Sequence, residues 1–129
     1  MYIEHLAIWC KDLEGMKDFY VKYFGATANQ QYHNPKNQFY SYFLRFEKGP
    51  RLELMQMPGI PDSLNDVIEQ FTGLIHFALS VGTEEKVNTI TEQFRKDGIR
   101  IVGEPRKTGD GYYESAILDI EGNRIEITV

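Results

Sequence analysis

The stretch Gly73-Leu74-Ile75-His76-Phe77-Ala78-Leu79-Ser80-Val81 has the alternating pattern of a β-strand with one buried face. Successive side chains of a strand point to opposite faces, so one face of this strand is wholly apolar: Ile75, Phe77, Leu79 and Val81. The other face carries one side chain of a metal-binding type, His76. Residues 2–10 show the same pattern, with His5 as their histidine. Two such strands predict a duplicated fold with a shared site.

The rest of each half repeats as well. Both strands are followed by an amphipathic helical pattern that ends at a glycine, Gly25 or Gly98. Three more strand patterns complete each half, and Gly25 and Glu53 are as far apart in sequence as Gly98 and Glu126. The sequence therefore predicts an α+β fold of two βαβββ modules in tandem, forming curved mixed sheets with a concave metal-site face.

The chain is predicted to be a single domain, residues 1–129, with three approximate parts: module 1 at about 1–57, a linker at about 58–72, and module 2 at about 73–129. The break is marked by Pro58-Gly59-Ile60-Pro61. A short helix is expected from about Asp62 to Phe71, and loops are expected at 33–37 and 104–111 because both stretches have turn chemistry.

Composition excludes several classes of protein. The 129 residues are 42% hydrophobic, enough for a core, but no run approaches 18 apolar residues, so no membrane span is expected. The N-terminus lacks the pattern of a signal peptide. The one cysteine, Cys10, is expected to be a buried thiol, and a cytoplasmic location follows from the absence of a disulfide framework. A net charge of −5 without a basic cluster disfavours nucleic acid as a partner.

The last strand of each half carries the chemistry. By alternation, Glu53 faces away from Leu52 and Leu54, and Glu126 faces away from Ile125 and Ile127. The glutamates are therefore expected on the same side as the histidines. Two imidazoles and two carboxylates suit a divalent metal ion such as Ni, Zn, Co, Mn or Fe. A structural zinc site is disfavoured because there is no cysteine cluster.

These residues resemble those of a known family. The paired modules, His5, Glu53, His76 in GLIHFALSV and Glu126 in EGNRIEI are together similar to the glyoxalase, bleomycin-resistance and extradiol-dioxygenase superfamily, also called the vicinal oxygen chelate fold. Within it, the order His, Glu, His, Glu is similar to glyoxalase I, the lactoylglutathione lyases. The resemblance implies that these four residues are metal ligands.

The resemblance also implies a reaction. A glyoxalase I-type lyase or isomerase transfers a proton through a metal-bound enediolate of a small dicarbonyl or hydroxycarbonyl substrate, which can be conjugated to a thiol. Glu126 or Glu53 would carry the proton, as base and then as acid. Trp9 stands where such enzymes commonly have an arginine that grips glutathione, which disfavours glutathione itself. Substrate-pocket candidates are Trp9, Gln56 and Phe43, with core packing as the alternative for the two aromatic residues.

Assembly and function leave alternatives open. The resemblance to small members of this family implies a homodimer with sites at the subunit interface. The alternative is that the two halves of one chain close on each other and form the site within that chain. The partner is expected to be a small-molecule substrate, with neither nucleic acid nor a membrane involved. The alternative functions are a non-catalytic small-molecule binding protein of the bleomycin-resistance type and a thiol transferase of the fosfomycin-resistance type.

Overall fold

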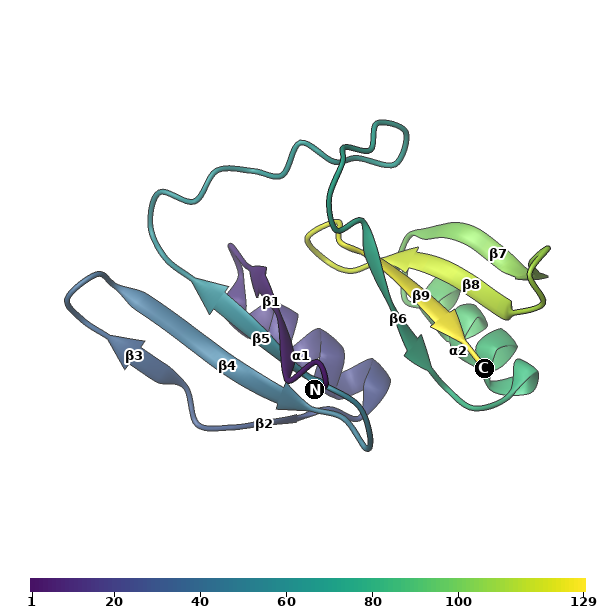
Figure 1. Ribbon diagram of the computed structural model, residues 1–129, viewed down its shortest axis with the longest axis horizontal. Coiled ribbons are helices and arrows are strands. Elements are labelled where there is room, and N and C mark those ends of the chain that lie inside the picture. The colour runs from purple at the N-terminus through teal and green to yellow at the C-terminus, as the bar shows by residue number, and fades with distance from the viewer. The chain divides into compact units, whose positions relative to one another are not determined.

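The computed structural model describes all 129 residues, which form two compact units, Met1–Asp62 and Ser63–Val129 (Figure 1). Unit 1 contains one helix and five strands: β1 (His5–Trp9), α1 (Leu13–Phe24), β2 (Thr27–Ala28), β3 (Tyr32–Asn34), β4 (Phe39–Arg45) and β5 (Arg51–Gln56). Unit 2 contains one helix and four strands: β6 (His76–Ser80), α2 (Glu84–Lys96), β7 (Ile101–Lys107), β8 (Tyr113–Leu118) and β9 (Arg124–Thr128). Neither helix is long and apolar enough to cross a membrane.

Both units contain a mixed sheet with the first and last strands side by side. In unit 1 the strand order is β1-β5-β4-β2, with β3 also paired to β4; in unit 2 it is β6-β9-β8-β7. The pairs β1–β5 and β6–β9 are parallel, and the other pairs are antiparallel. This confirms the predicted α+β fold of tandem βαβββ modules. In unit 1 the second strand of the module is divided into β2 and β3.

Each helix begins directly after a residue whose side chain caps its first turn. The Asp12 carboxylate accepts a hydrogen bond from the Gly15 backbone N–H at 2.9 Å, and the Thr83 side chain accepts one from Lys86 N–H at 3.2 Å. Gly25 ends α1 with a left-handed φ of 62°, which glycine adopts without a Cβ clash. The polypeptide can therefore turn back onto the sheet directly after the helix.

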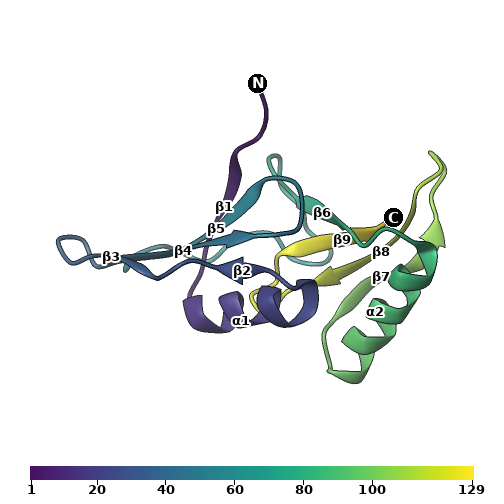
Figure 2. The same ribbon diagram turned by 90° about the horizontal axis from the view of Figure 1, so that it is seen from below.

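The helices cover one face of each sheet (Figure 2). In unit 1 the buried side chains between helix and sheet include Met16, Phe19, Tyr20, Leu44, Leu52 and Leu54; in unit 2 they include Val87, Phe94, Ile117, Ile125 and Ile127. Cys10 is also buried, as predicted. In unit 2 the buried hydroxyl of Thr91 lies 2.7 Å from that of Ser115, so two buried polar groups satisfy each other. The opposite face of each sheet remains for chemistry.

The predicted helix from Asp62 to Phe71 is wrong, because this segment has no helix in the structure. Its polar side chains instead bind nearby backbone. Asp66 accepts hydrogen bonds from the N–H groups of Ile68 and Glu69, both at 2.6 Å, and Asn65 accepts one from Phe71 at 2.8 Å. Such local contacts offer the backbone an alternative to helical hydrogen bonds.

The first residues of both predicted loops belong to strands in the structure. Residues 33 and 34 belong to β3, where the His33 ring stacks on Tyr40 with centroids 4.2 Å apart. The loop predicted at 104–111 is strand as far as Lys107, although it contains Pro105. Because β7 is the outermost strand of its sheet and its pairing shifts register before Arg106, a proline is tolerated there.

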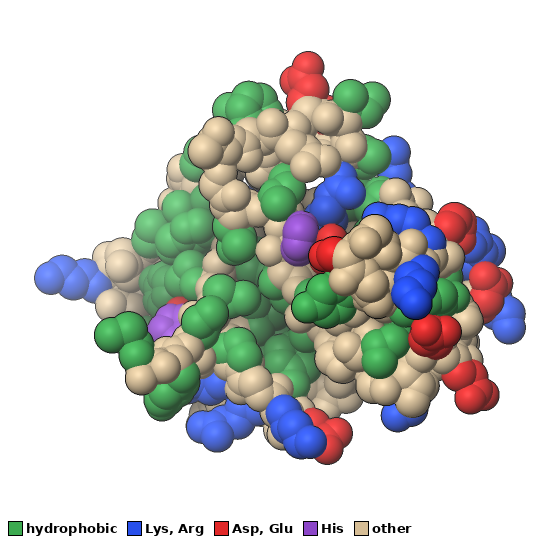
Figure 3. Space-filling model, turned by 45° about the vertical axis from the view of Figure 1, so that its right-hand side comes forward, with side chains coloured by type: hydrophobic (Ala, Val, Ile, Leu, Met, Phe, Trp, Pro, Cys, Tyr) green, Lys and Arg blue, Asp and Glu red, His purple; other side chains and the backbone are tan.

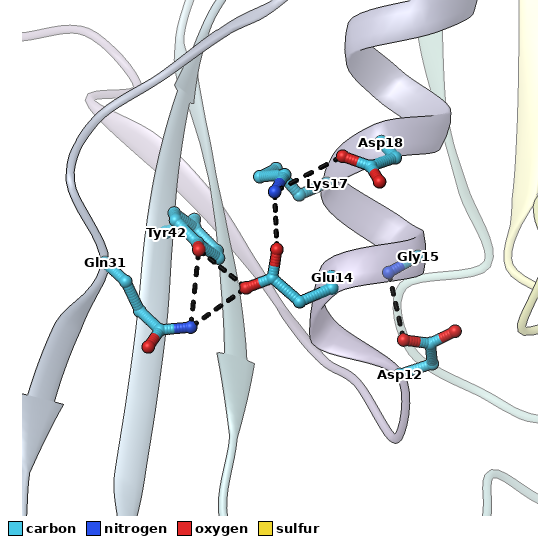
Figure 4. Close-up of polar contacts among 7 residues, drawn as sticks. All are labelled: Asp12, Glu14, Gly15, Lys17, Asp18, Gln31 and Tyr42. Atoms are coloured by element: carbon cyan, nitrogen blue, oxygen red, sulfur yellow. Dashed lines mark hydrogen bonds and ion pairs between the residues drawn. The ribbon is translucent and has the colours of Figure 1, made fainter.

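A polar cluster joins the start of α1 to the sheet of unit 1 (Figure 4). The Glu14 carboxylate accepts hydrogen bonds from Lys17 at 2.5 Å, from the Tyr42 hydroxyl at 2.6 Å and from the Gln31 amide at 3.1 Å. The bond from Lys17, followed by that from Tyr42, holds the pKa of Glu14 below its ordinary value of 4.5. In turn, the Glu14 carboxylate raises the pKa of Tyr42.

We expect this cluster to make stability depend on pH. A carboxyl group with a lowered folded-state pKa contributes stability above its unfolded pKa, about 4.5, and that contribution is lost as the pH falls through the folded pKa. Glu14→Gln should therefore lower the free energy of unfolding at pH 7, by less than about 1 kcal/mol because the cluster is exposed. The difference from the native protein should shrink at about pH 3. Denaturant unfolding measures both values, with Glu85→Gln, in the first turn of α2, as the control.

Candidate metal centre

In unit 1, the parallel strands β1 and β5 bring one histidine and one glutamate together. Ala7 pairs with Glu53, so Glu53 lies beside the strand that carries His5. The distance from His5 Nε2 to Glu53 Oε2 is 3.8 Å, and the side chains are 39% and 16% exposed. Both lie on the face opposite the buried Leu52 and Leu54. The pair is therefore accessible from outside the unit.

Unit 2 repeats this arrangement on β6 and β9. His76 Nε2 lies 3.2 Å from Glu126 Oε2, and the side chains are 39% and 23% exposed. Histidine side chains are visible at the surface in the space-filling view (Figure 3). Both Ile125 and Ile127 on the other face of β9 are fully buried.

The two pairs occupy the same register positions. His5 pairs with Arg51 just as His76 pairs with Arg124, and Ala7 faces Glu53 just as Ala78 faces Glu126. A coincidence of unrelated surface residues would not reproduce both the strand and the register. The repeated pair is therefore a property of the module.

The donor atoms of each pair fit a divalent cation in type and spacing. Imidazole nitrogen and carboxylate oxygen are both good ligands for borderline cations. Two donors on one ion, each bonded at roughly 2.0–2.2 Å, lie roughly 3.0–3.4 Å apart. The observed 3.2 Å matches this separation, and 3.8 Å needs only a small side-chain movement. No three or more histidine, cysteine, aspartate or glutamate side chains are placed so that they could hold one metal ion together, so each pair supplies two ligands.

Two charged residues next to His5 were missed by the sequence analysis. Glu4 Oε2 lies 2.5 Å from His5 Nδ1, and Glu4 Oε1 lies 2.5 Å from Arg51 Nη2. The hydrogen bond with His5, together with the Arg51 guanidinium, holds the pKa of Glu4 below its ordinary value. The sequence signal for this contact is the position of Glu4 directly before His5.

The predicted pocket residues divide between the two faces. Phe43 lies on the same face as Glu53, and its ring meets that of His5 edge to face with centroids 5.4 Å apart. Trp9 is on this face as well and remains 40% exposed. Gln56 lies on the opposite face by strand alternation, and its amide donates a hydrogen bond to the Lys11 carbonyl oxygen. The structure thus brings Phe43 to the His5–Glu53 pair but turns Gln56 away from it.

Comparison with known proteins identifies the family. The family model described as the Glyoxalase/Bleomycin resistance protein/Dioxygenase superfamily matches residues 2–127. The Bacillus subtilis (strain 168) protein YwkD is 29% identical over 106 residues, which are 82% of this chain and 77% of YwkD.

Solved structures show the same fold. A glyoxalase family protein from Enterococcus faecalis has a TM-score of 0.78 and 23% identity, covering 98% of this chain and 96% of that one. Glyoxalase I from Zea mays also has a TM-score of 0.78, with 22% identity, covering 98% of this chain and 44% of the larger Zea mays chain. At these identities the likeness shows the fold.

Proposed function

Because this chain belongs to the glyoxalase/bleomycin resistance protein/dioxygenase superfamily, we propose that it is a metal-dependent lyase or isomerase of the glyoxalase I type. It would transfer a proton between adjacent carbons of a small dicarbonyl or hydroxycarbonyl compound. The observation that carries this proposal is the repeated pair of His and Glu at equal register positions in both units. Both pairs are accessible; the pair in unit 2 has the spacing of two ligands on one ion, and the pair in unit 1 needs only a small side-chain movement to reach it.

The metal ligands in this proposal are His5, Glu53, His76 and Glu126. Each unit supplies two of these ligands. The set of four therefore combines the His5–Glu53 pair with the His76–Glu126 pair, taken from one chain or from two chains. A divalent ion such as Ni²⁺, Zn²⁺, Co²⁺, Mn²⁺ or Fe²⁺ would supply Lewis acidity, which makes a proton next to a carbonyl group easier to remove. An ion that prefers six ligands would have two positions left for substrate oxygens.

The glutamates would move the proton. A carboxylate on the accessible face takes the proton from one carbon and returns it to the neighbouring carbon, acting as base and then as acid. Glu126 and Glu53 are the two candidates, and both are less exposed than their histidine partners. Partial burial limits the access of water to the carboxylate during transfer.

We further propose a cytoplasmic homodimer in which each metal site uses ligands from both subunits. A single buried cysteine is suited to a reducing compartment, and a symmetric dimer would supply two complete ligand sets. Light scattering of the purified protein gives its mass in solution. A dimer at micromolar concentration supports the shared site, and a monomer that binds metal tightly would contradict it.

The two units differ in what surrounds the ligand pairs, and this favours a substrate with an apolar group. Trp9 and Phe43 stand in unit 1 at the register positions that Ser80 and Ala116 hold in unit 2. The Trp9 ring meets Phe39 edge to face at 6.1 Å, which extends the aromatic surface across the sheet. Such rings contact planar or apolar groups.

Trp9→Ala is expected to raise KM for an aryl dicarbonyl such as phenylglyoxal by about tenfold, the equivalent of the ~1.5 kcal/mol of an aromatic contact. Trp9→Phe should restore most of the loss, and KM for methylglyoxal should change little. Initial-rate kinetics with both substrates measure this difference. An equal KM for phenylglyoxal in the native and alanine proteins would assign Trp9 to packing alone.

The function is tested with purified protein that has been loaded with Ni²⁺, Co²⁺ or Zn²⁺ and assayed with methylglyoxal in the presence and absence of several thiols. Turnover that requires the metal supports the lyase. If turnover occurs only when one particular thiol is present, that thiol is identified as the partner of the substrate. Tight binding of dicarbonyls without turnover by any metal form would overturn the lyase and favour a binding protein of the bleomycin-resistance type.

A further inference from the structure

We propose that Glu4 is a positioning residue for His5: its carboxylate holds the imidazole in the form with hydrogen on Nδ1, so that Nε2 is free to bind the metal. The close contact between Glu4 Oε2 and His5 Nδ1, at 2.5 Å, carries this inference. The part that concerns metal binding rests on the proposed function, whereas the part that concerns the imidazole tautomer does not.

Glu4 is held in place from two sides. Its Oε1 pairs with Arg51 Nη2 at 2.5 Å, and its backbone carbonyl accepts a hydrogen bond from the Arg51 N–H at 3.0 Å. The Arg51 guanidinium is itself fixed above the Phe43 ring, with its carbon 4.0 Å from the ring centroid. The planar cation can stack on the ring and bind the carboxylate at once. Glu4 therefore has a defined orientation despite its exposure.

The contact selects one form of the neutral imidazole. An ionised carboxylate only accepts hydrogen bonds, so the hydrogen between the two groups belongs to His5 Nδ1. The lone pair is then on Nε2, the nitrogen nearer to Glu53. A carboxylate on the far nitrogen also fixes the ring orientation and raises the basicity of the ligating nitrogen. Glu4 thus directs the donor atom of His5 toward the candidate metal ligand Glu53.

In unit 2, no carboxylate binds the Nδ1 atom of His76. The residue before His76 is Ile75, which has no hydrogen-bonding side chain. Arg124, at the register position of Arg51, donates a hydrogen bond to the carbonyl oxygen of Val67 at 3.4 Å instead. The two histidines share a register position, but only His5 has a carboxylate on Nδ1. His76 is therefore an internal control for His5.

Nitrogen NMR of the histidine rings tests the tautomer in metal-free full-length protein at about pH 8, above the ordinary histidine pKa of about 6.5. We expect His5 to carry its hydrogen on Nδ1 in the native protein and in Glu4→Gln, whose amide oxygen still accepts a hydrogen bond. In Glu4→Ala the hydrogen should move to Nε2, while His76 and His33 remain unchanged. An identical His5 pattern in the native and alanine proteins would overturn the inference.

Metal affinity provides the second measurement, by competition with a chelator that reports free Co²⁺. Glu4→Ala should bind Co²⁺ about tenfold more weakly, at the low end of the ~10- to 100-fold cost of removing such supporting groups. Glu4→Gln should recover part of this loss, and Glu104→Ala, which removes an exposed carboxylate paired with Arg95, should bind as the native protein does. Equal affinities for all four proteins would overturn the role of Glu4 in metal binding. If the native protein bound no metal, the proposed function would be wrong. The tautomer of His5 would still be tested by the NMR measurement.

Discussion

Glu126→Gln is expected to lower kcat of the metal-loaded enzyme by about 10²- to 10⁴-fold, the usual contribution of a positioned general acid–base group. The amide has nearly the same shape as the carboxylate, so the β9 strand and its buried Ile125 and Ile127 should be undisturbed. However, the amide cannot accept the substrate proton and is a weaker ligand for a divalent ion. Initial rates with methylglyoxal and the preferred thiol measure the loss.

The matched control is Glu104→Gln, an exposed glutamate on β7 of the same unit. It should retain native kcat. If Glu126→Gln and the native protein turned over at the same rate, Glu126 would have no part in the chemistry.

Comparing Glu126→Gln with Glu53→Gln separates the two candidate bases. Both variants should bind the metal more weakly, because each loses a charged ligand. When both are saturated with metal, the variant that lacks the proton carrier should show the larger loss of kcat. Metal content measured on the same samples distinguishes lost chemistry from lost metal.

His76→Ala is expected to weaken metal binding by more than about 100-fold. Loss of a group that only supports a ligand costs about 10- to 100-fold in affinity, and loss of the ligand itself should exceed this. His76 is partly exposed at the surface of β6, so its removal leaves the core intact. Titration calorimetry with Ni²⁺ measures the affinity, and thermal unfolding checks that the variant is folded.

His33→Ala is the control for this prediction, because His33 stacks on Tyr40 in the β3–β4 pair and has no carboxylate partner. It should bind Ni²⁺ as the native protein does. Unchanged binding in His76→Ala, or an equal loss in His33→Ala, would remove His76 from the ligand set.

Much of the fold follows from strand alternation, since it is a local property. The alternation in residues 73–81 places His76 on the face opposite the half-buried Phe77 and Leu79, and the same pattern in the last strands places Glu53 and Glu126. The repeat then implies that equivalent strands pair in the same way, which the identical registers of β1–β5 and β6–β9 bear out. Each His–Glu pair could thus be predicted from pattern alone.

Features that depend on particular side-chain contacts were not accessible in this way. Residues 62–71 resemble a helix in composition, but Asn65 and Asp66 bind local backbone groups instead. Glu4 becomes relevant only because Arg51, distant in sequence, pairs with it. In both cases the deciding contact is one that no sequence pattern specifies. The place of Gln56 on the face opposite Glu53, by contrast, follows from the same strand alternation.

A crystal structure of the protein grown with Ni²⁺, with anomalous diffraction recorded at the nickel edge, tests the ligand set most directly. We predict one strong anomalous peak per ligand set, within bonding distance of His5 Nε2, His76 Nε2 and carboxylate oxygens of Glu53 and Glu126, from one chain or from two. A nickel-loaded crystal without a peak at these four side chains would contradict the assignment.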